Sequence, residues 1–388
     1  MEPQPLGSTI KGITTGHRFG RYPGVSGEVM VDTAVFRLEG VTKRYGDLVA
    51  LDNATLEAGA NEYISLLGPS GSGKTTLLRV IAGFEAPEAG RVYFEGRDIT
   101  HVPAHERGIG FVFQNFALFP HLTVIQNVAF GLTHGKSGLS PSEIERRSLE
   151  MIDLVGLSGM EGRGVDQISG GQRQRVALAR TLTMHPRLVL LDEPLGALDA
   201  NLRGRMRNEL RAIRERLGVT FLHVTGSETE ALAMGDRVVV LNRGRIIQTG
   251  KPNDVYDRPA SPDVAHFLNR FNLFDGRLSG GVFSGVFGVA PAGQAVHADR
   301  DIYAVRYDRI NVLPVGAGAD GPGIRAKFLT SEYLGSSIVN FFETADGEVI
   351  EMEHHLSLGA PQTFEIRQDY LLTWNPEQAI AFGREARS

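Results

Sequence analysis

Residues 68–75 (Gly-Pro-Ser-Gly-Ser-Gly-Lys-Thr) have the types and spacing of a glycine-rich loop that binds phosphate groups. In such a loop the glycines let backbone N–H groups turn inward, the lysine reaches the β- and γ-phosphates, and the hydroxyl residue supplies a ligand to Mg²⁺. We therefore expect Lys74 to act on the terminal phosphates of a bound nucleotide and Thr75 to hold Mg²⁺. The positions expected to contact the nucleotide are Gly68, Ser70, Gly71, Ser72, Gly73, Lys74, Thr75 and Thr76. Alone, the loop is equally typical of a kinase, a GTPase or a transporter ATPase, and a chance glycine turn is the structural alternative.

Two neighbouring carboxylates form a second candidate group. Asp192 and Glu193 follow the apolar run 188–191, so they are expected at the carboxyl end of a buried strand, where ligands of open α/β sheets bind. Asp192 should hold Mg²⁺, and Glu193 can act as the general base that polarises an attacking water. The alternative is a pair of acids that merely end a strand.

The surrounding pattern predicts the elements that would position these residues. The apolar run 63–67 leads directly into the glycine loop, and residues 77–82 read as a helix that stops at Gly83. A helix over 140–155 is predicted with Ser140 as its N-cap and Glu143 completing a capping box. Apolar residues recur at helical spacing from 198 to 217, and 219–225 and 237–241 read as further strands. This alternation predicts an α/β fold with a mostly parallel sheet.

The chain changes character after about residue 271. Short strand-like runs occur at 302–307, 324–329, 338–343 and 349–353, and Asp346-Gly347 is a strong hairpin signal. We expect a small β-barrel of the OB-like type there. The predicted organisation is a flexible extension (1–34), a nucleotide-binding domain (35–270) with a helical insert (about 115–180), and a C-terminal β domain (271–388).

Composition excludes several classes of protein. The 388 residues contain no cysteine, which fits a reducing compartment, and no apolar run is long enough to span a membrane as a helix. The net charge of −5 provides no footprint for nucleic acid. The N-terminal residues lack the pattern of a secretory signal. A cytoplasmic location is therefore expected.

Ser169, Gly170, Gly171 and Gln172 lie between the glycine loop and the acidic strand, and they open a helix. A hydroxyl and bare backbone amides at a helix start suit a γ-phosphate. The order of glycine loop, Ser-Gly-Gly-Gln turn and acidic strand resembles the ATP-binding cassette of ABC transporters. The resemblance extends from about residue 36 to the C-terminus and implies a P-loop NTPase core with an inserted helical subdomain.

The resemblance also implies roles for single residues. Tyr45 lies where the family stacks an aromatic ring on adenine, although an ordinary half-buried tyrosine is the alternative. Gln114 matches the glutamine that touches Mg²⁺ and takes part in catalysis. Residues 168–172 match the signature, with Ile168 in place of the usual leucine, and Asp199 belongs to the loop that crosses the dimer interface. In the family, the signature contacts the ATP of the partner subunit.

The resemblance further implies an importer. Two ATPase subunits would sandwich ATP at the cytoplasmic face of the inner membrane and drive transmembrane permease subunits, with a substrate-binding protein involved indirectly. The C-terminal domain looks closest to the polyamine group of importers, followed by sugar or glycerol types. The apolar segment 116–121 is either core or a docking groove for the permease subunits.

One position departs from the family pattern. Gly226, after the strand 219–225, stands where the family has a histidine that contacts the γ-phosphate. His223 is three residues earlier on an extended strand, so it faces the other side and is expected to be a core residue. We therefore expect the ATP site built on Lys74 to bind ATP but to hydrolyse it poorly, and we expect a heterodimer with a second ATPase whose histidine is intact. A homodimer is the alternative.

Two other functions remain open from the sequence. One is a subunit that senses ATP with little hydrolysis of its own, although the presence of Glu193 opposes a complete loss of chemistry. The other is an ABC ATPase that acts outside transport, but such proteins usually carry two cassettes or a coiled-coil insertion. The adjacent His354 and His355 are not expected to bind a metal, because neighbours on a strand face opposite ways.

Overall fold

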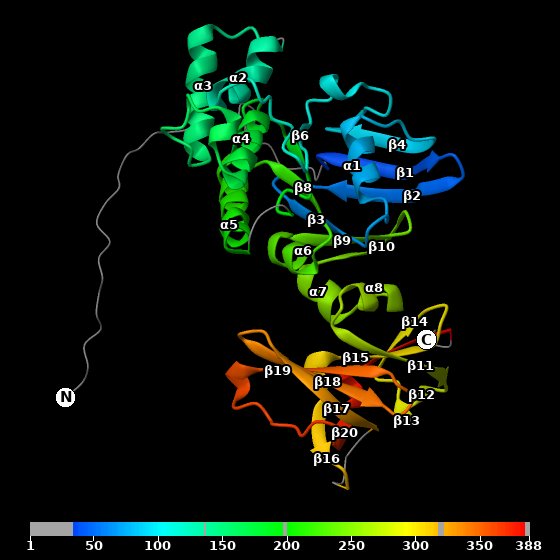
Figure 1. Cartoon of the computed structure of the whole chain (residues 1–388). Helices are drawn as coiled ribbons and strands as arrows, with labels where there is room; N and C mark the ends of the chain where they lie inside the picture. Colours follow the sequence, from blue (N-terminus) through cyan, green and yellow to red (C-terminus); the bar gives the residue numbers. More distant parts are fainter. Residues whose placement is uncertain (1–33, 136, 197–199, 317–321, 385–388) are drawn as a thin grey trace, which may run out of the picture.

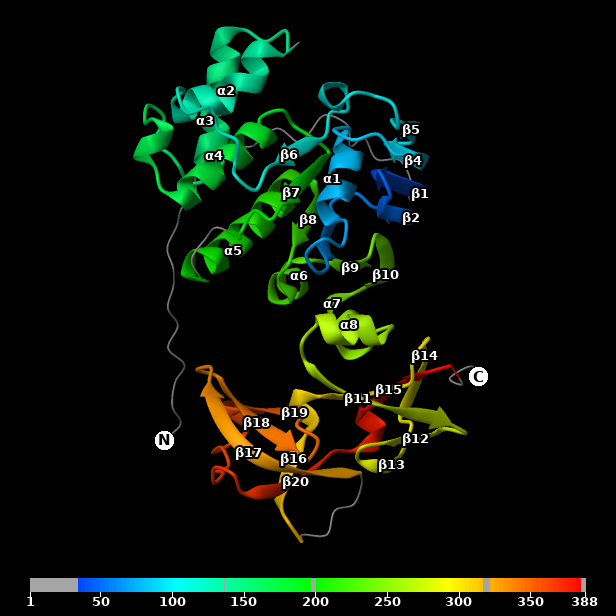
Figure 2. The ribbon, with the colours of Figure 1, turned by 45° about the vertical axis from the view of Figure 1, so that its right-hand side comes forward.

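A computed structural model describes residues 34–135, 137–196, 200–316 and 322–384. The predicted N-terminal extension therefore lies outside the described residues, apart from position 34. Figure 1 shows an α/β body at one end and a β domain at the other, with two short helices between them, and the turned view in Figure 2 agrees.

A mixed sheet forms the centre of the α/β body. Its order is β10–β9–β3–β8–β7–β6, and all neighbouring strands are parallel except β9 and β10. The expected mostly parallel sheet is thus confirmed. The strands are β3 (Tyr63–Leu67), β6 (Gly110–Val112), β7 (Leu188–Asp192), β8 (Thr220–Thr225), β9 (Arg237–Asn242) and β10 (Arg245–Gly250).

Both faces of this sheet are covered, because every residue of β3 and β8 is buried. One face packs on helix α1 (Lys74–Ala82) and a smaller antiparallel sheet. That smaller sheet comprises β1 (Phe36–Tyr45), β2 (Leu48–Ala58), β4 (Ala89–Phe94) and β5 (Arg97–Asp98). The other face packs against the helices that follow, α2 (Val124–His134), α3 (Pro141–Leu154), α4 (Gly170–Leu182), α5 (Ala200–Leu217) and α6 (Glu228–Met234).

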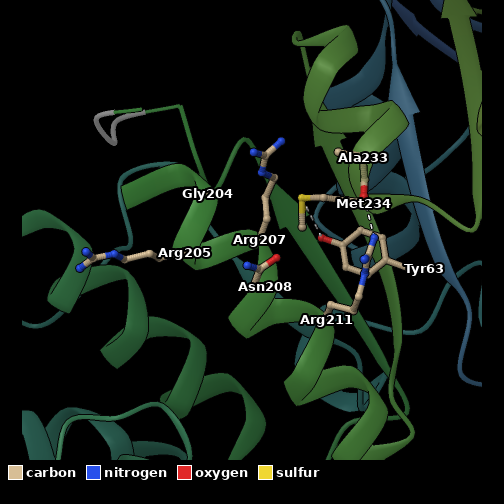
Figure 3. Close-up of a pocket in the computed structure, with 8 residues that line it drawn as sticks. All are labelled: Tyr63, Gly204, Arg205, Arg207, Asn208, Arg211, Ala233 and Met234. Atoms are coloured by element: carbon tan, nitrogen blue, oxygen red, sulfur yellow. Dashed lines mark hydrogen bonds between the residues drawn. The ribbon is translucent and has the colours of Figure 1, made fainter. Parts of the chain in front are cut away.

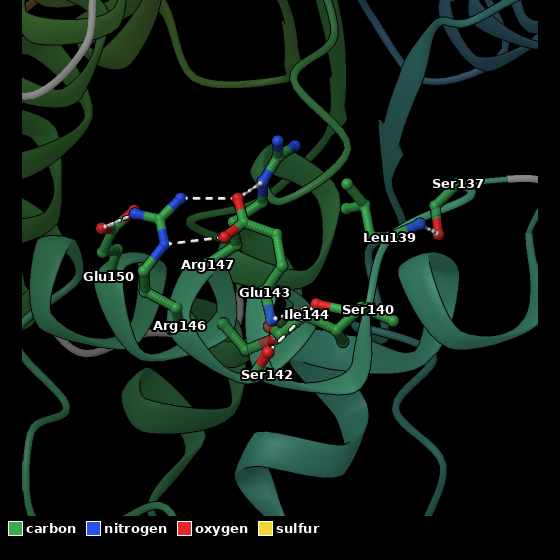
Figure 4. A network of polar contacts seen from close by, with 10 residues as sticks. Ser137, Leu139, Ser140, Ser142, Glu143, Ile144, Arg146, Arg147 and Glu150 are labelled. Carbon is green, nitrogen blue, oxygen red and sulfur yellow. Dashed lines mark hydrogen bonds and ion pairs between the residues drawn. The ribbon is translucent and has the colours of Figure 1, made fainter.

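Helices α2, α3 and α4 gather at the end of the molecule away from the β domain (Figure 1), in the region predicted as a helical insert. Ser140 caps α3 as predicted, since its hydroxyl accepts the Glu143 N–H at 3.3 Å. The second half of the predicted capping box is wrong. The Glu143 carboxylate instead accepts hydrogen bonds from Arg146 and Arg147 (Figure 4), because these guanidiniums lie one turn along the same helix face.

The C-terminal domain consists of two sheets around one core. Their orders are β13–β12–β11–β15–β21–β14 and β16–β20–β17–β18–β19. The predicted strands are all present and the Asp346-Gly347 turn joins β18 to β19, with Gly347 at a φ of 83°. Aromatic residues from both sheets, among them Tyr303 of β15 and Phe342 of β18, fill the shared core together with Trp374. This arrangement confirms the small β-rich, OB-like domain.

The strands of this domain are β11 (Phe271–Ser279), β12 (Val282–Gly285), β13 (Gly288–Pro291), β14 (Gln294–His297), β15 (Ile302–Arg306), β16 (Asn311–Pro314), β17 (Gly323–Tyr333), β18 (Ser337–Thr344), β19 (Val349–His355), β20 (Asp369–Thr373) and β21 (Ile380–Gly383).

An apolar cluster joins the two bodies. Leu67 and Val240 of the central sheet belong to the same buried cluster as Phe271 and Phe382 of the β domain, with α7 (Pro252–Asp257) and α8 (Pro262–Phe267) between them. The cluster continues across position 270, where the sequence predicts a domain boundary. The proposed boundary therefore passes through a shared apolar core.

None of the helices in the described parts of the chain is long and apolar enough to cross a membrane.

Candidate nucleotide-binding site

The glycine loop follows β3 and opens α1, which is the order of elements that its motif requires. Close approach of neighbouring backbone explains two of its glycines. A Cβ at Gly68 would collide with the Leu241 carbonyl oxygen, and one at Gly73, whose φ is 104°, would collide with the Ala50 carbonyl oxygen. The backbone of the loop therefore packs closely against these two carbonyl groups, which hold it in place without a ligand.

Lys74 lies folded over this loop. Its Nζ donates to the carbonyl oxygens of Gly68 at 2.7 Å and Pro69 at 2.9 Å, and only 7% of the residue is exposed. Burial lowers the pKa of Lys74, while the nearby carboxylates of Glu193 and Asp192 act in the opposite direction. A buried cation beside the loop amides gives the site a positive character that suits phosphate.

Asp192 and Thr75 face each other at the end of β7. The Thr75 hydroxyl donates to Asp192 Oδ1 at 3.4 Å. Burial raises the pKa of Asp192, and the adjacent Glu193 carboxylate raises it further. Two carboxylates and a hydroxyl form a set of hard oxygen donors, which is the ligand type that Mg²⁺ prefers. The residues present therefore fit a magnesium ion.

Glu193 is held in an unusual backbone conformation, with a φ of 44°. Its N–H donates to the Val224 carbonyl at 3.0 Å, which locks it to the end of β8. Its Oε2 accepts a hydrogen bond from Gln114 Nε2 at 2.9 Å. The two predicted catalytic side chains are thus in direct contact, although they follow different strands, β6 and β7.

Gly226 lies just after the end of β8, next to the strand that leads to Glu193. Val224 pairs with Asp192 in the parallel register of β7 and β8, so Gly226 follows the strand end beside the acidic pair. A Cβ at Gly226 would meet no atom within 4 Å, and its φ is not in the left-handed region. The backbone therefore imposes no need for glycine at this position.

His223 cannot take the place of a residue at position 226. It is completely buried, its ring meets Tyr63 edge-on at 6.0 Å, and neither ring nitrogen has a hydrogen-bond partner among the described residues. Burial lowers the pKa of His223 to about 3, so the ring is neutral at neutral pH. The predicted core role of His223 is confirmed.

The signature turn (residues 169–172) forms the start of α4. Ser169 Oγ accepts the Gln172 N–H, and Gln172 Oε1 accepts the Ser169 N–H at 2.8 Å, which together make a full capping box. Gly171 is buried, and a Cβ there would collide with Leu202 of α5. Among the described residues, no hydrogen bond joins the signature turn to the glycine loop of the same chain.

Arg180 is a residue of this region that the sequence reading missed. From the last turn of α4 it donates to the carbonyl oxygens of Ala117 at 2.7 Å and Phe116 at 2.9 Å. Both acceptors have left-handed backbones, with φ of 43° and 64°. Arg180 thereby ties the helix of the signature turn to the segment that follows Gln114. Only this contact in the structure reveals the role of Arg180. Its neighbours in the sequence do not distinguish it from the other arginines of the same helix.

Two further predictions concern single residues. Tyr45 is 42% exposed at the end of β1, with Lys43 Nζ at 5.3 Å from its ring centre, so its ring is available for stacking. Its contact with adenine stays a prediction. Asp199 and its loop lie outside the described residues.

The site and fold define a class: a P-loop ATPase with a helical insert, whose helix α4 is opened by a signature turn. A family model described as "ABC transporter" matches residues 51–196. The sulfate/thiosulfate import ATP-binding protein CysA of Caulobacter vibrioides is 45% identical over 81% of this chain and 91% of its own length. The spermidine/putrescine import ATP-binding protein PotA of Nitrosomonas eutropha is 39% identical over 90% of this chain and 98% of its own length.

Solved structures agree with these relatives. A dimeric post-hydrolysis state of the ATP-binding cassette MJ0796 with bound ADP and Pi has a TM-score of 0.51 and 33% identity, and the match covers 56% of this chain and 98% of that one. The chain therefore belongs to the ABC transporter family. It is an ATP-binding, ATP-hydrolysing subunit of the importer type, a class that dimerises and works with transmembrane permeases.

Proposed function

We propose that this chain binds Mg²⁺-ATP over the Lys74 loop and powers polyamine import through permease subunits at the cytoplasmic face of the inner membrane. The observation that supports the nucleotide role most strongly is the meeting of residues from three strand ends. Lys74 follows β3, Asp192 and Glu193 end β7, and Gln114 follows β6. The mechanism of such an ATPase needs these groups at one sheet edge.

Each side chain has a proposed role. Lys74 would bind the β- and γ-phosphates, while Thr75 and Asp192 would hold Mg²⁺, with the Gln114 side-chain oxygen as a further ligand. Bound Mg²⁺ supplies charge neutralisation between the phosphates. Glu193 would accept a proton from the attacking water. The hydrogen bond from Gln114 orients the Glu193 carboxylate toward that water.

The solute is proposed from the relatives. PotA, which matches nearly the full length of the chain, is a spermidine/putrescine import protein by name, and this agrees with the polyamine type expected from the sequence. Sulfate is the second candidate because of the CysA match. Uptake of labelled spermidine, putrescine and sulfate into cells with and without the chain would test the choice. Loss of polyamine uptake alone is expected, and unchanged uptake of all three would contradict the proposal; sugars or glycerol form a further arm.

We further propose a heterodimer. Gly226 leaves the Lys74 site without a histidine, whereas the signature turn is complete. A second ATPase with that histidine would bind ATP over its own loop and receive residues 169–172 of this chain. Purification of the native complex tests the pairing by subunit stoichiometry. One copy of this chain with one different ATPase is expected, and two copies with no second ATPase would contradict the pairing.

A subunit that only senses ATP is the alternative function, favoured by the same glycine. Glu193→Gln separates the two possibilities in the purified chain, because removing the base should abolish whatever slow hydrolysis remains and leave ATP bound. A sensor would show identical turnover before and after the substitution.

A further inference from the structure

A cavity of about 460 Å³ lies outside the nucleotide site, between α5 and α6. It reaches Tyr63, the first residue of β3, and so lies at the opposite end of that strand from the glycine loop. Its described lining residues are Tyr63, Gly204, Arg205, Arg207, Asn208, Arg211, Ala233 and Met234 (Figure 3). No described lining residue is acidic.

Two guanidiniums from successive turns of α5 face this cavity. Arg211 donates through Nη2 to the Ala233 carbonyl oxygen at 2.7 Å, and its other donors have no partner among the described residues. Arg207 is half-buried and makes no hydrogen bond or ion pair with any described residue. Arg207 and Arg211 are four residues apart on one helix face, so their like charges repel unless an anion lies between them.

The nearby carboxylates are occupied elsewhere. Glu209 binds Arg175 at 2.6 Å, and Asp236 binds Arg214. Helix α5 as a whole carries six arginines and two glutamates. Glu230, whose charge reaches Tyr63, is bonded to Thr225. Arg207 and Arg211 therefore form no ion pair with a described residue, in contrast to the paired arginines on α3.

Neutral groups complete the cavity. The Tyr63 hydroxyl has only a long contact of 3.8 Å with Met234 Sδ, and the Asn208 amide is exposed beside the arginines. Guanidinium forks match the oxygens of phosphate, sulfate or carboxylate groups. Met234 and the Tyr63 ring add an apolar wall. The volume is large enough for a small organic molecule, and exceeds what a bare ion needs.

We propose that the α5–α6 cavity is a binding site for a small organic anion, whose charged group lies between Arg207 and Arg211. The cavity contacts α6 at Ala233 and Met234, the end of that helix remote from Gly226, and contacts α5 over residues 204–211, its middle turns. An anion bound at the cavity therefore joins the middle of α5 to the far end of α6.

Glycerol 3-phosphate is a suitable probe, with sodium sulfate as the charged group alone. Both would be titrated into the full chain at constant ionic strength, with a saturating non-hydrolysable ATP analogue to occupy the glycine loop. The melting temperature is expected to rise saturably by about 2–4 °C with glycerol 3-phosphate. In Arg207→Gln/Arg211→Gln, the half-saturating concentration should rise at least tenfold.

Arg203→Gln/Arg216→Gln is the matched control, since it removes two charges from the same helix at positions that do not line the cavity. This variant should keep the wild-type response. Hydrogen exchange in residues 228–234 gives a second, local measurement, and protection by the probe is expected in the wild type and the control but not in Arg207→Gln/Arg211→Gln. Equal responses in the control and in Arg207→Gln/Arg211→Gln, or none in the wild type, would overturn the proposal.

Discussion

The signature turn and the end of β8 differ in how strongly the fold constrains them. At the turn, Gly171 is fixed by Leu202 and a full capping box holds Ser169 and Gln172. At the end of β8, the space around Gly226 is open and its backbone is ordinary. Packing thus explains a glycine at 171 and does not explain one at 226. The chain therefore keeps the signature turn, which is proposed to act on a partner's ATP, intact. At position 226, beside its own ATP site, it has no side chain.

The largest expected effect comes from the signature turn. Ser169→Ala in the assembled importer should lower ATP turnover about 100-fold, because it removes a hydroxyl donor from the partner's composite site. Ser140→Ala is the matched control, since Ser140 is also an N-cap. Both variants should lose about 1 kcal/mol of stability. A similar turnover in the two variants would show that the turn serves only to cap its helix.

Glu193→Gln in the same complex sharpens the comparison. Because the site that contains Glu193 lacks a histidine at 226, its loss should change turnover less than about threefold, far below the usual effect of removing a general base. Steady-state ATPase assays of the complex would measure this. A loss as great as that of Ser169→Ala would mean that turnover of the complex requires hydrolysis at the site that contains Glu193, which contradicts the account.

Arg180 tests whether the two regions communicate. Arg180→Gln should raise the half-saturating Mg²⁺ concentration about tenfold, because the segment after Gln114 loses two charge-assisted hydrogen bonds. Ala117→Gly should partly restore the value, since glycine adopts the left-handed backbone without that support. Arg173→Gln is the control, because Arg173 binds Val165 within the same insert. Absence of rescue would point to a purely structural role for Arg180.

The smallest effect concerns His223. Its pKa is lowered in the folded chain to about 3, so the unfolded chain binds the proton first as the pH falls below about 6.5. Stability is therefore complete above that pH and declines toward pH 3. Between pH 7 and 5, the free energy of unfolding by urea should fall about 2 kcal/mol more in the wild type than in His223→Leu. Equal losses would place the imidazole in contact with water.

Local sequence signals were sufficient to predict part of the nucleotide-binding site. The glycine loop, the acidic pair and the alternation of strands and helices each depend on neighbouring residues, and the structure places Lys74, Asp192 and Glu193 together as those signals predict. The contact of Arg180 with the segment after Gln114 joins residues more than sixty positions apart, and no local pattern encodes it. The apolar cluster between the two bodies was missed for a similar reason, because apolar strands do not reveal what covers them. The capping box predicted at Glu143 was wrong because two arginines compete with the helix N-terminus for the Glu143 carboxylate.

The central claim is that residue 226 limits hydrolysis at the Lys74 site. ATP turnover by the purified chain, compared with Gly226→His and the control Gly226→Ala, tests it most directly, since a Cβ at position 226 meets no atom within 4 Å. The histidine variant should turn over ATP at least tenfold faster than the wild type, and the alanine variant should not differ from it. A wild-type rate already equal to that of Gly226→His would contradict the account.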